Sequence, residues 1–151
     1  MEKNTIDFKR IGMNEIEMIK DLFFSVFTTE PWNDDWSDQK QLDLYLQDLV
    51  GQSNSLTYGL FEDDKLVGVS MGHIKHWYSG TEYYIEELFV QTSKQGNGIG
   101  TYFLKEIEKG IKNLGLVQIF LQTESTVPAY DFYIKNGFSE LNEHVSFVKK
   151  I

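Results

Sequence analysis

Cysteine is absent from this chain of 151 residues. Its absence excludes disulfide frameworks, zinc sites built from thiolates and a cysteine nucleophile. Basic residues are also few, with 14 Lys and Arg against 23 Asp and Glu, so the net charge is −9. We expect no nucleic-acid partner, because nucleic-acid binding requires a basic surface. The acidic balance favours cationic partners instead.

Long hydrophobic runs are missing as well. The N-terminal residues lack the apolar core of a secretory signal, and no stretch approaches the roughly 20 apolar residues of a membrane span. We therefore expect a soluble, cytoplasmic protein with no membrane partner. Proline occurs only at Pro31 and Pro128, and no linker or repeat interrupts the chain. These features predict one domain over residues 1–151, large enough to bury a core without a metal or disulfide.

Apolar residues recur at helical spacing in three parts of the chain, and Pro128 indicates the first turn of a fourth helix. Asn14 is a candidate N-cap of the first helix, which ends before Pro31. Gly115 is a candidate C-terminal cap of the third helix. The predicted helices span 16–26, 37–51, 103–114 and 128–137.

Segments rich in branched and aromatic residues predict the strands. These strands span 5–8, 56–61, 65–77, 83–90, 117–121, 138–141 and 145–148. The resulting order is β-α-α-β-β-β-α-β-α-β-β. It predicts an α/β fold with a mixed sheet rather than a repeating βαβ unit.

The strongest chemical signal is a glycine-rich segment between a predicted strand and a predicted helix, Gln95-Gly96-Asn97-Gly98-Ile99-Gly100-Thr101. Glycines let the backbone turn sharply and leave consecutive N–H groups facing outward. The following helix adds its own free N–H groups and its dipole. The segment predicts an anion site suited to a phosphate or pyrophosphate, with a plain strand-to-helix turn as the alternative.

Three nucleotide motifs can be compared with this segment. A P-loop requires a lysine after its second glycine, and none is present. A Rossmann fingerprint requires a third glycine where this chain has Thr101 or Phe103, depending on the starting residue. The pattern Gln-x-x-Gly-x-Gly does fit, with Gln95, Gly98 and Gly100.

This pattern after a strand resembles the acetyl-CoA pyrophosphate loop of the GNAT N-acetyltransferases. A second segment, AYDFYIKNGF at 129–138, resembles the A-x-x-F-Y-x-x-x-G-F segment of the same family. The resemblance extends from the first helix to about Phe138. It implies a single-domain GNAT-like α/β (α+β) fold, with a mixed, mostly antiparallel sheet flanked by helices, and a homodimer is a further expectation.

The resemblance also implies where acetyl-CoA binds. Backbone amides of 95–101 would hold the pyrophosphate, and the backbone of Leu88, Phe89 and Val90 would pair with pantetheine as a pseudo-strand. Thr126 stands where many members have an asparagine that contacts the cofactor. The implied cofactor-binding residues are Leu88, Phe89, Val90, Gln95, Gly96, Asn97, Gly98, Ile99, Gly100, Thr101, Thr126 and Tyr133.

Acetyl transfer to an amine requires a proton acceptor, a donor to the carbonyl oxygen and a proton donor for the thiolate. Similarity to the aminoglycoside 6'-N-acetyltransferases points to Glu86 as the base, or as a group that only binds the amine. Other GNAT enzymes carry the base two residues earlier, where Tyr84 is unsuitable at neutral pH. The oxyanion donor is expected to be a main-chain N–H near Val90.

Glu87 is a second candidate. Strict alternation along the strand places Glu86 and Glu87 on opposite faces. The face of Glu86 would also carry Tyr84, Leu88 and Val90, and that of Glu87 would carry Ile85 and Phe89.

Tyr133 matches the family tyrosine that precedes the Gly-Phe pair, so the resemblance implies that it is the general acid, although a packing role in the core is the alternative. Tyr130 is expected to pack. The three histidines are scattered, and His73 and His76 fall on opposite faces of a strand, so no metal site is predicted.

The segment 30–38 combines carboxylates with indole rings, which suits a cationic acceptor through charge and cation–π contacts. Alternatively, the tryptophans pack in the core and the acids are solvated. The candidate substrate-binding residues are Trp32, Asp34, Asp35, Trp36, Tyr84 and Glu86.

Together these features predict an acetyl-CoA-dependent N-acetyltransferase in which a bound amine attacks directly, without a covalent enzyme intermediate. The expected acceptor is a cationic small molecule, such as an aminoglycoside or polyamine. A protein or peptide amine is the alternative acceptor. A non-catalytic acyl-CoA-binding module is the alternative of another class.

Overall fold

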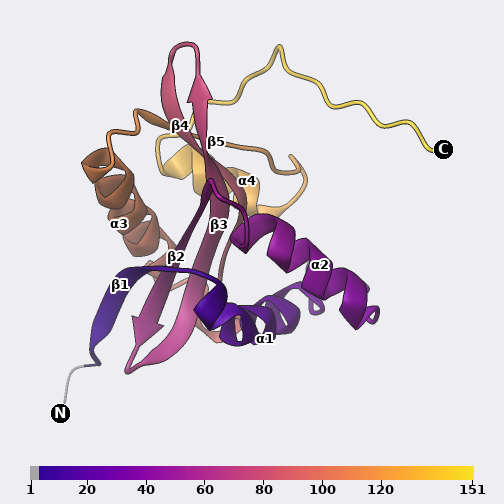
Figure 1. Ribbon diagram of the computed structural model, residues 1–151, viewed down its shortest axis with the longest axis vertical. Helices are drawn as coiled ribbons and strands as arrows, with labels where there is room; N and C mark the ends of the chain where they lie inside the picture. Colours follow the sequence, from indigo (N-terminus) through magenta and orange to yellow (C-terminus); the bar gives the residue numbers. More distant parts are fainter. Residues whose placement is uncertain (1–3) are drawn as a thin grey trace.

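The computed structural model describes residues 4–151, which form a five-stranded sheet with four helices (Figure 1). The strands lie in the order β1-β2-β3-β4-β5, with antiparallel pairing from β1 to β4 and parallel pairing between β4 and β5. The strands are β1 (Ile6–Ile11), β2 (Ser55–Glu62), β3 (Lys65–Trp77), β4 (Gly80–Val90) and β5 (Gln118–Leu121). The helices are α1 (Ile16–Phe27), α2 (Gln39–Val50), α3 (Ile99–Asn113) and α4 (Pro128–Lys135).

Two hydrophobic clusters hold the helices to opposite faces of the sheet (Figure 1). On one face, α1 and α2 pack against Val69 and Met71 of β3 and Phe89 of β4. On the other, α3 packs against β2, β3 and β4 through Phe103 and Ile107. The predicted mixed α/β sheet is confirmed. Within residues 4–151, no helix has both the length and the apolar character needed to cross a bilayer.

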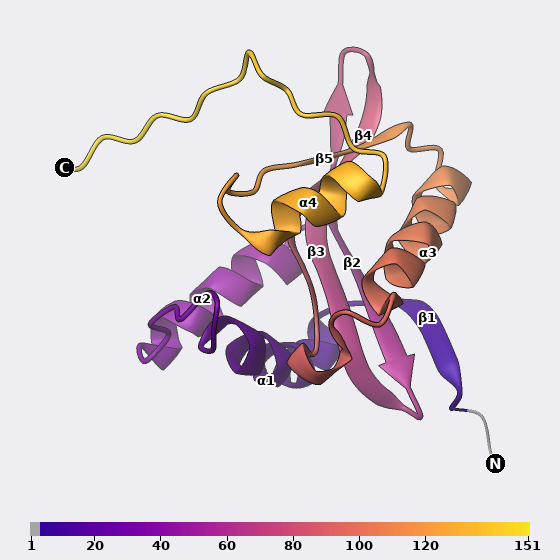
Figure 2. The same cartoon turned by 180° about the vertical axis from the view of Figure 1, so that it is seen from behind.

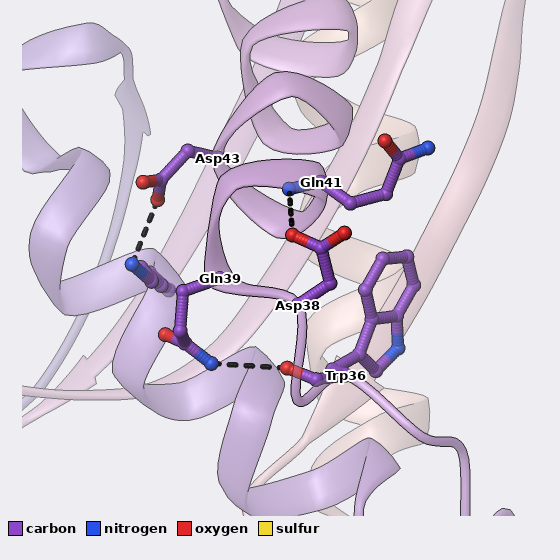
Figure 3. A network of polar contacts seen from close by, with 6 residues as sticks. Trp36, Asp38, Gln39, Gln41 and Asp43 are labelled. Carbon is purple, nitrogen blue, oxygen red and sulfur yellow. Dashed lines mark hydrogen bonds and ion pairs between the residues drawn. The ribbon is translucent and has the colours of Figure 1, made fainter.

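Local capping explains where the first two helices begin. Asn14 is not the N-cap of α1, because a 3₁₀ turn over Met13–Glu15 precedes the helix and leaves Glu15 at the cap position. Asp38 caps α2, since its carboxylate accepts a hydrogen bond from the Gln41 N–H at 3.0 Å (Figure 3). The second helix therefore starts at Gln39, two residues later than predicted.

The predicted strands at 138–141 and 145–148 are wrong for the isolated chain. After α4 the chain follows an irregular path that leads away from the sheet (Figures 1 and 2). Phe147 is 93% exposed and Val148 is 91% exposed, so neither side chain contributes to the core. A strand needs a neighbour to bond with, and no described strand of this chain lies beyond β5.

Tyr83 provides a test of the core. Its side chain is fully buried, and its hydroxyl donates to the Leu56 carbonyl oxygen and lies 2.8 Å from the Ser70 hydroxyl. Tyr83→Phe leaves these buried groups without that partner, so we expect a loss of about 1–3 kcal/mol in the free energy of unfolding. Urea denaturation measures it. Tyr78→Phe, at a 91% exposed position, should leave stability unchanged, and equal effects of both variants would contradict this account.

Candidate active site

The strands β4 and β5, which form one edge of the sheet, pair over only part of the length of β4. Their parallel pairing runs from Glu82 opposite Gln118 to Ile85 opposite Leu121, where β5 ends. β4 continues to Val90, so the main-chain groups of 86–90 that face away from β3 have no strand partner within residues 4–151. An extended ligand with amide groups can pair with such an edge. The candidate cofactor residues Leu88, Phe89 and Val90 lie on it.

A β-bulge lies at Glu86. Met71 pairs with Glu87 and Gly72 pairs with Ile85, so Glu86 is the extra residue of β4. At Gly72 a Cβ atom would lie 2.0 Å from the Tyr84 carbonyl oxygen, so only glycine allows this close approach.

The bulge changes which residues share a face of β4. Leu88 and Val90 pack on the α3 side together with Ile85, whereas Phe89 joins the core beneath α1 and α2. The prediction from strict alternation is therefore wrong for Ile85, which does not share the face of Phe89. A glycine inside a strand pattern is the signal that could have indicated the bulge.

The glycine-rich loop leads from β4 into the N-terminus of α3. Gly96 and Gly98 have φ angles of +81° and +79°, a conformation that side chains rarely adopt, and Gly98 is the N-cap. Within residues 4–151, no side chain caps the start of α3, and its first turn holds no acidic residue. The free amides at this terminus fit the diphosphate of coenzyme A, with 96–101 as the residues that would hold it. The Gln95 N–H is not among them, because it already donates to the Thr92 carbonyl oxygen at 3.2 Å.

Two contacts fix this loop in place. The Gln95 side chain donates to the Val90 carbonyl oxygen at 3.2 Å, which ties the loop to the end of β4. At Gly100 a Cβ atom would lie 3.1 Å from the ring of Phe132, so glycine lets α3 and α4 approach closely. The two family-like segments are thereby brought together. Thr126 is exposed in the turn that precedes α4.

Glu87 lies on the α2 side of β4, where Tyr45 donates to its Oε1 at 2.7 Å. Burial raises the pKa of Glu87 to about 7, and the nearby charges of Glu86 and Asp34 raise it further, while the Tyr45 hydrogen bond opposes the shift. Such a carboxylate can exchange a proton at neutral pH. The sequence analysis missed Tyr45, because nothing in α2 distinguishes it from a packing residue. Glu86 is exposed at the bulge.

Tyr133 lies on α4 between Phe132 and Phe138, at ring-centroid distances of 5.4 and 5.2 Å. Burial raises the pKa of Tyr133 to about 12, and the charge of Glu87 adds to the shift. The phenol therefore stays protonated at neutral pH and is a proton donor only. Its titration is electrostatically linked to Glu87, although the two residues come from different elements.

Both tryptophans of the loop between α1 and α2 pack against the core, as the packing alternative predicts. Trp32 contacts Phe27 at a centroid distance of 5.5 Å. Trp36 stacks on Tyr45 at a centroid distance of 5.4 Å. The Gln39 side chain donates to the Trp36 carbonyl oxygen (Figure 3). Within residues 4–151, the buried indole N–H of Trp36 has no hydrogen-bond partner. The loop is thus connected to Glu87 through Trp36 and Tyr45.

The two loop carboxylates differ in environment. The charge of Asp34 acts on both Tyr45 and Glu87, and its main-chain N–H donates to the Phe27 carbonyl oxygen at 2.8 Å. Asp35 instead accepts a hydrogen bond from the Ser37 N–H at 3.0 Å, and hydrogen bonding to Ser37 lowers its pKa. Asp34, Glu86 and Glu87 therefore make this part of the site acidic.

Tyr84 lies further along β4, among aromatic rings. It stacks on His73 at a centroid distance of 5.0 Å and contacts Phe120 at 4.9 Å. Its hydroxyl donates to the Gln122 side chain at 3.3 Å, and burial raises its pKa. These contacts favour a wall of the site over a base.

Parted parallel strands followed by an uncapped, glycine-rich helix start suit a ligand that combines an extended amide-bearing chain with a phosphate group. Residues 16–138 match the model of the Acetyltransferase (GNAT) family. The chain belongs to this family of acetyltransferases, whose acyl donor is acetyl-CoA. No curated protein matches the chain.

Several solved structures share the fold. An aminoglycoside acetyltransferase from an uncultured soil metagenomic sample, solved with sisomicin, has 23% identity and a TM-score of 0.74 over 97% of this chain and 96% of that one. The aminoglycoside N-acetyltransferase AAC(6')-Iy, solved with CoA, has 17% identity and a TM-score of 0.74 over 99% and 97%. A possible acetyltransferase from Clostridium difficile 630 has 17% identity and a TM-score of 0.80 over 97% and 98%.

The anion site predicts a charge-specific effect at Gly98. Gly98→Asp places a carboxylate where the diphosphate binds, so we expect the Kd for coenzyme A to rise about tenfold through like-charge repulsion. Isothermal titration calorimetry measures it. Gly115→Asp is the matched control, because Gly115 has a φ angle of +82° and equally open surroundings at the other end of α3. Equal loss of affinity in both variants would argue against the site.

Proposed function

We propose that the protein transfers an acetyl group from acetyl-CoA to an amine of a cationic small molecule, of the aminoglycoside or polyamine type, by direct attack. The observation that carries the proposal is the group of acidic residues Asp34, Glu86 and Glu87 beside the parted strands. An alkylammonium ion is attracted to such a group, and an acidic site discriminates against anionic acceptors. The net charge of −9 acts in the same direction over longer distances.

The two neighbouring glutamates would have different roles. Glu86 is exposed at the bulge, so it would pair with the arriving ammonium group. Glu87 is held by Tyr45 and has a pKa of about 7, so it would accept the proton that the amine must lose before it attacks. This assignment retains Glu86 in its amine-binding role and favours Glu87 as the base.

The remaining steps need a hydrogen-bond donor to the thioester carbonyl oxygen and a proton donor to the sulfur. The acetyl-CoA supplies the activated acyl group. A main-chain N–H near Val90 would stabilise the carbonyl oxygen as the amine nitrogen bonds to the carbonyl carbon. Tyr133 would give its proton to the sulfur when the carbon–sulfur bond breaks, since its phenol is protonated at neutral pH.

The aminoglycoside acceptor class is supported by similarity of fold. Two of the structures described above are aminoglycoside acetyltransferases, one of them solved with sisomicin. Both are less than 25% identical to this chain. The choice among cationic acceptors therefore depends on a direct assay.

That assay measures thiol release from acetyl-CoA with a panel of aminoglycosides, polyamines and peptides. We expect turnover with at least one polycationic small molecule and a lower kcat/KM for peptides. Glu86→Gln should raise KM for the acceptor more than it lowers kcat, because it removes a charge that binds the amine. Turnover with peptides alone would overturn the acceptor class. Coenzyme A binding without any turnover would instead support a non-catalytic module.

Glu87 gives a pH-dependent prediction. With the wild-type chain, kcat/KM should rise with pH around a midpoint near 7 as Glu87 loses its proton. Glu87→Gln should lower kcat/KM by about 10²-fold or more and remove this limb. A pH–rate profile at fixed acceptor concentration measures both. An unchanged profile in Glu87→Gln, together with a lost limb in Glu86→Gln, would transfer the base role to Glu86.

Two controls separate catalysis from folding. Tyr45→Phe keeps the ring on Trp36 but removes a hydrogen bond that lowers the pKa of Glu87, so the midpoint of the pH–rate profile should move to higher pH.

The raised pKa of Glu87 also means that the folded state binds more protons than the unfolded state. Stability is thus lost as pH rises through the folded pKa. Glu87→Gln should therefore have a higher Tm than the wild type at pH 8.

A further inference from the structure

The connection between β4 and α3 is attached to the end of the β2–β3 hairpin, away from the proposed reacting groups. This connection, residues 91–95, contains a 3₁₀ turn and leads directly into the glycine-rich loop. Within it the Lys94 N–H donates to the Gln91 carbonyl oxygen at 2.8 Å, and the Gln95 N–H donates to the Thr92 carbonyl oxygen at 3.2 Å. Figure 2 shows the connection at the end of the sheet where β2 and β3 are joined.

A second β-bulge supplies the first attachment. The pairing of β2 with β3 shifts its register between Leu60 and Phe61, which leaves Val67 as the extra residue of β3. The Val67 carbonyl oxygen accepts a hydrogen bond from the Gln91 N–H at 2.7 Å. The connection therefore starts from a fixed point on the neighbouring strand as soon as β4 ends.

An ion pair supplies the second attachment. The Lys94 Nζ lies 2.9 Å from Oε2 of Glu62 at the end of β2, and the Asn4 side chain donates a hydrogen bond to the other carboxylate oxygen. The side chain of Glu62 is 13% exposed and that of Lys94 is 36% exposed, so the pair is largely shielded from water. Hydrogen bonds from Lys94 and Asn4 lower the pKa of Glu62, which keeps its carboxylate ionised at neutral pH.

We propose that Glu62 and Lys94 are positioning residues for the acyl donor, and that their ion pair fixes the start of the glycine-rich loop before the diphosphate of coenzyme A binds. The loop needs such support, because Gly96 and Gly98 have the widest backbone freedom of any residue type. Among residues 4–151, no atom outside their immediate neighbours lies within 4 Å of where their Cβ atoms would be. Ordering a free loop at the moment of binding costs conformational entropy and weakens affinity.

The contacts favour positioning over direct attraction of the diphosphate by the lysine. The ammonium group of Lys94 is already paired with a carboxylate, so the pair is neutral as a whole and acts weakly on a distant anion. What remains is a geometric constraint on the next residue, Gln95, whose side chain is bonded to the Val90 carbonyl oxygen. Because this constraint concerns acetyl-CoA alone, it is independent of the proposed acceptor and of the proposed base.

The first test is the affinity of Glu62→Ala for coenzyme A, measured by isothermal titration calorimetry. Positioning and direct attraction predict opposite signs. Loss of a positioning contact should raise the Kd about fivefold, which is the upper end of what an ion pair of this exposure contributes. If the carboxylate instead competes with the diphosphate for Lys94, its removal should lower the Kd. A Kd that falls or stays the same would overturn the proposal.

Asp43→Ala is the matched control for charge and for the loss of an ion pair. Asp43 lies 2.7 Å from the Lys20 Nζ, where it joins α2 to α1. Both helices pack on the face of the sheet opposite α3, so this variant removes the same charge far from the glycine-rich loop. It should keep the wild-type Kd. An equal rise in Kd in both variants would show that overall charge or stability, and not the loop, is responsible.

The second test observes the connection directly, in the absence of coenzyme A. Hydrogen exchange measured by NMR follows the hydrogen-bonded N–H groups of Gln91, Lys94 and Gln95. Glu62→Ala and Lys94→Met should each speed their exchange about fivefold, because the local opening becomes easier, whereas the Asp43→Ala control should not. A lysine that acts only through its charge on the cofactor would leave these exchange rates unchanged, and that result would refute positioning.

Steady-state kinetics separate positioning of the donor from general damage to the fold. With an acceptor that supports turnover, Glu62→Ala should raise the KM for acetyl-CoA about fivefold and leave kcat unchanged at saturation, because the ion pair does not touch the reacting atoms. A lowered kcat with an unchanged KM would mean that the variant disturbs the reacting groups instead, which contradicts a role confined to the loop.

Discussion

The separation of β4 from β5 is the constraint on which the proposed chemistry depends. The two strands share only four residue pairs, from Glu82 with Gln118 to Ile85 with Leu121. If the pairing continued to Val90, the main-chain groups of β4 would be used within the sheet and no extended ligand could bind there. Because the pairing stops at Ile85, the edge of β4 stays unpaired up to Val90. The free amides at the start of α3 follow it along the chain. Gln95 fixes the junction between them.

The packing around this opening raises the pKa of one carboxyl group to near neutral pH. Glu87 is partly buried beneath α2, and its carboxylate accepts a hydrogen bond from Tyr45. Such a group is unfavourable for stability when charged and useful for proton transfer. The clusters on either face of the sheet are extensive enough to tolerate it, since most of their residues are almost completely buried.

Sequence patterns predicted the features that depend on local chemistry. Apolar spacing identified three helices and Pro128 indicated the fourth. The glycines at 96, 98 and 100 indicated the loop whose geometry the structure describes. Patterns failed where the outcome depends on distant residues. The bulge at Glu86 requires β3 to approach β4 at Gly72, and strict alternation cannot anticipate it. Tyr45 acquires its role only because α2 lies over β4. The last two predicted strands have no neighbouring strand to pair with among residues 4–151.

The stack of Trp36 on Tyr45 links two properties that are usually treated as separate. Trp36 belongs to the loop expected to border the acceptor, and Tyr45 is the donor that sets the proton affinity of Glu87. A change in the loop that displaces the indole would also disturb the phenol, and through it the acidity at which the enzyme works. Attempts to re-engineer the choice of acceptor at this loop should therefore be expected to shift the optimum pH together with the specificity.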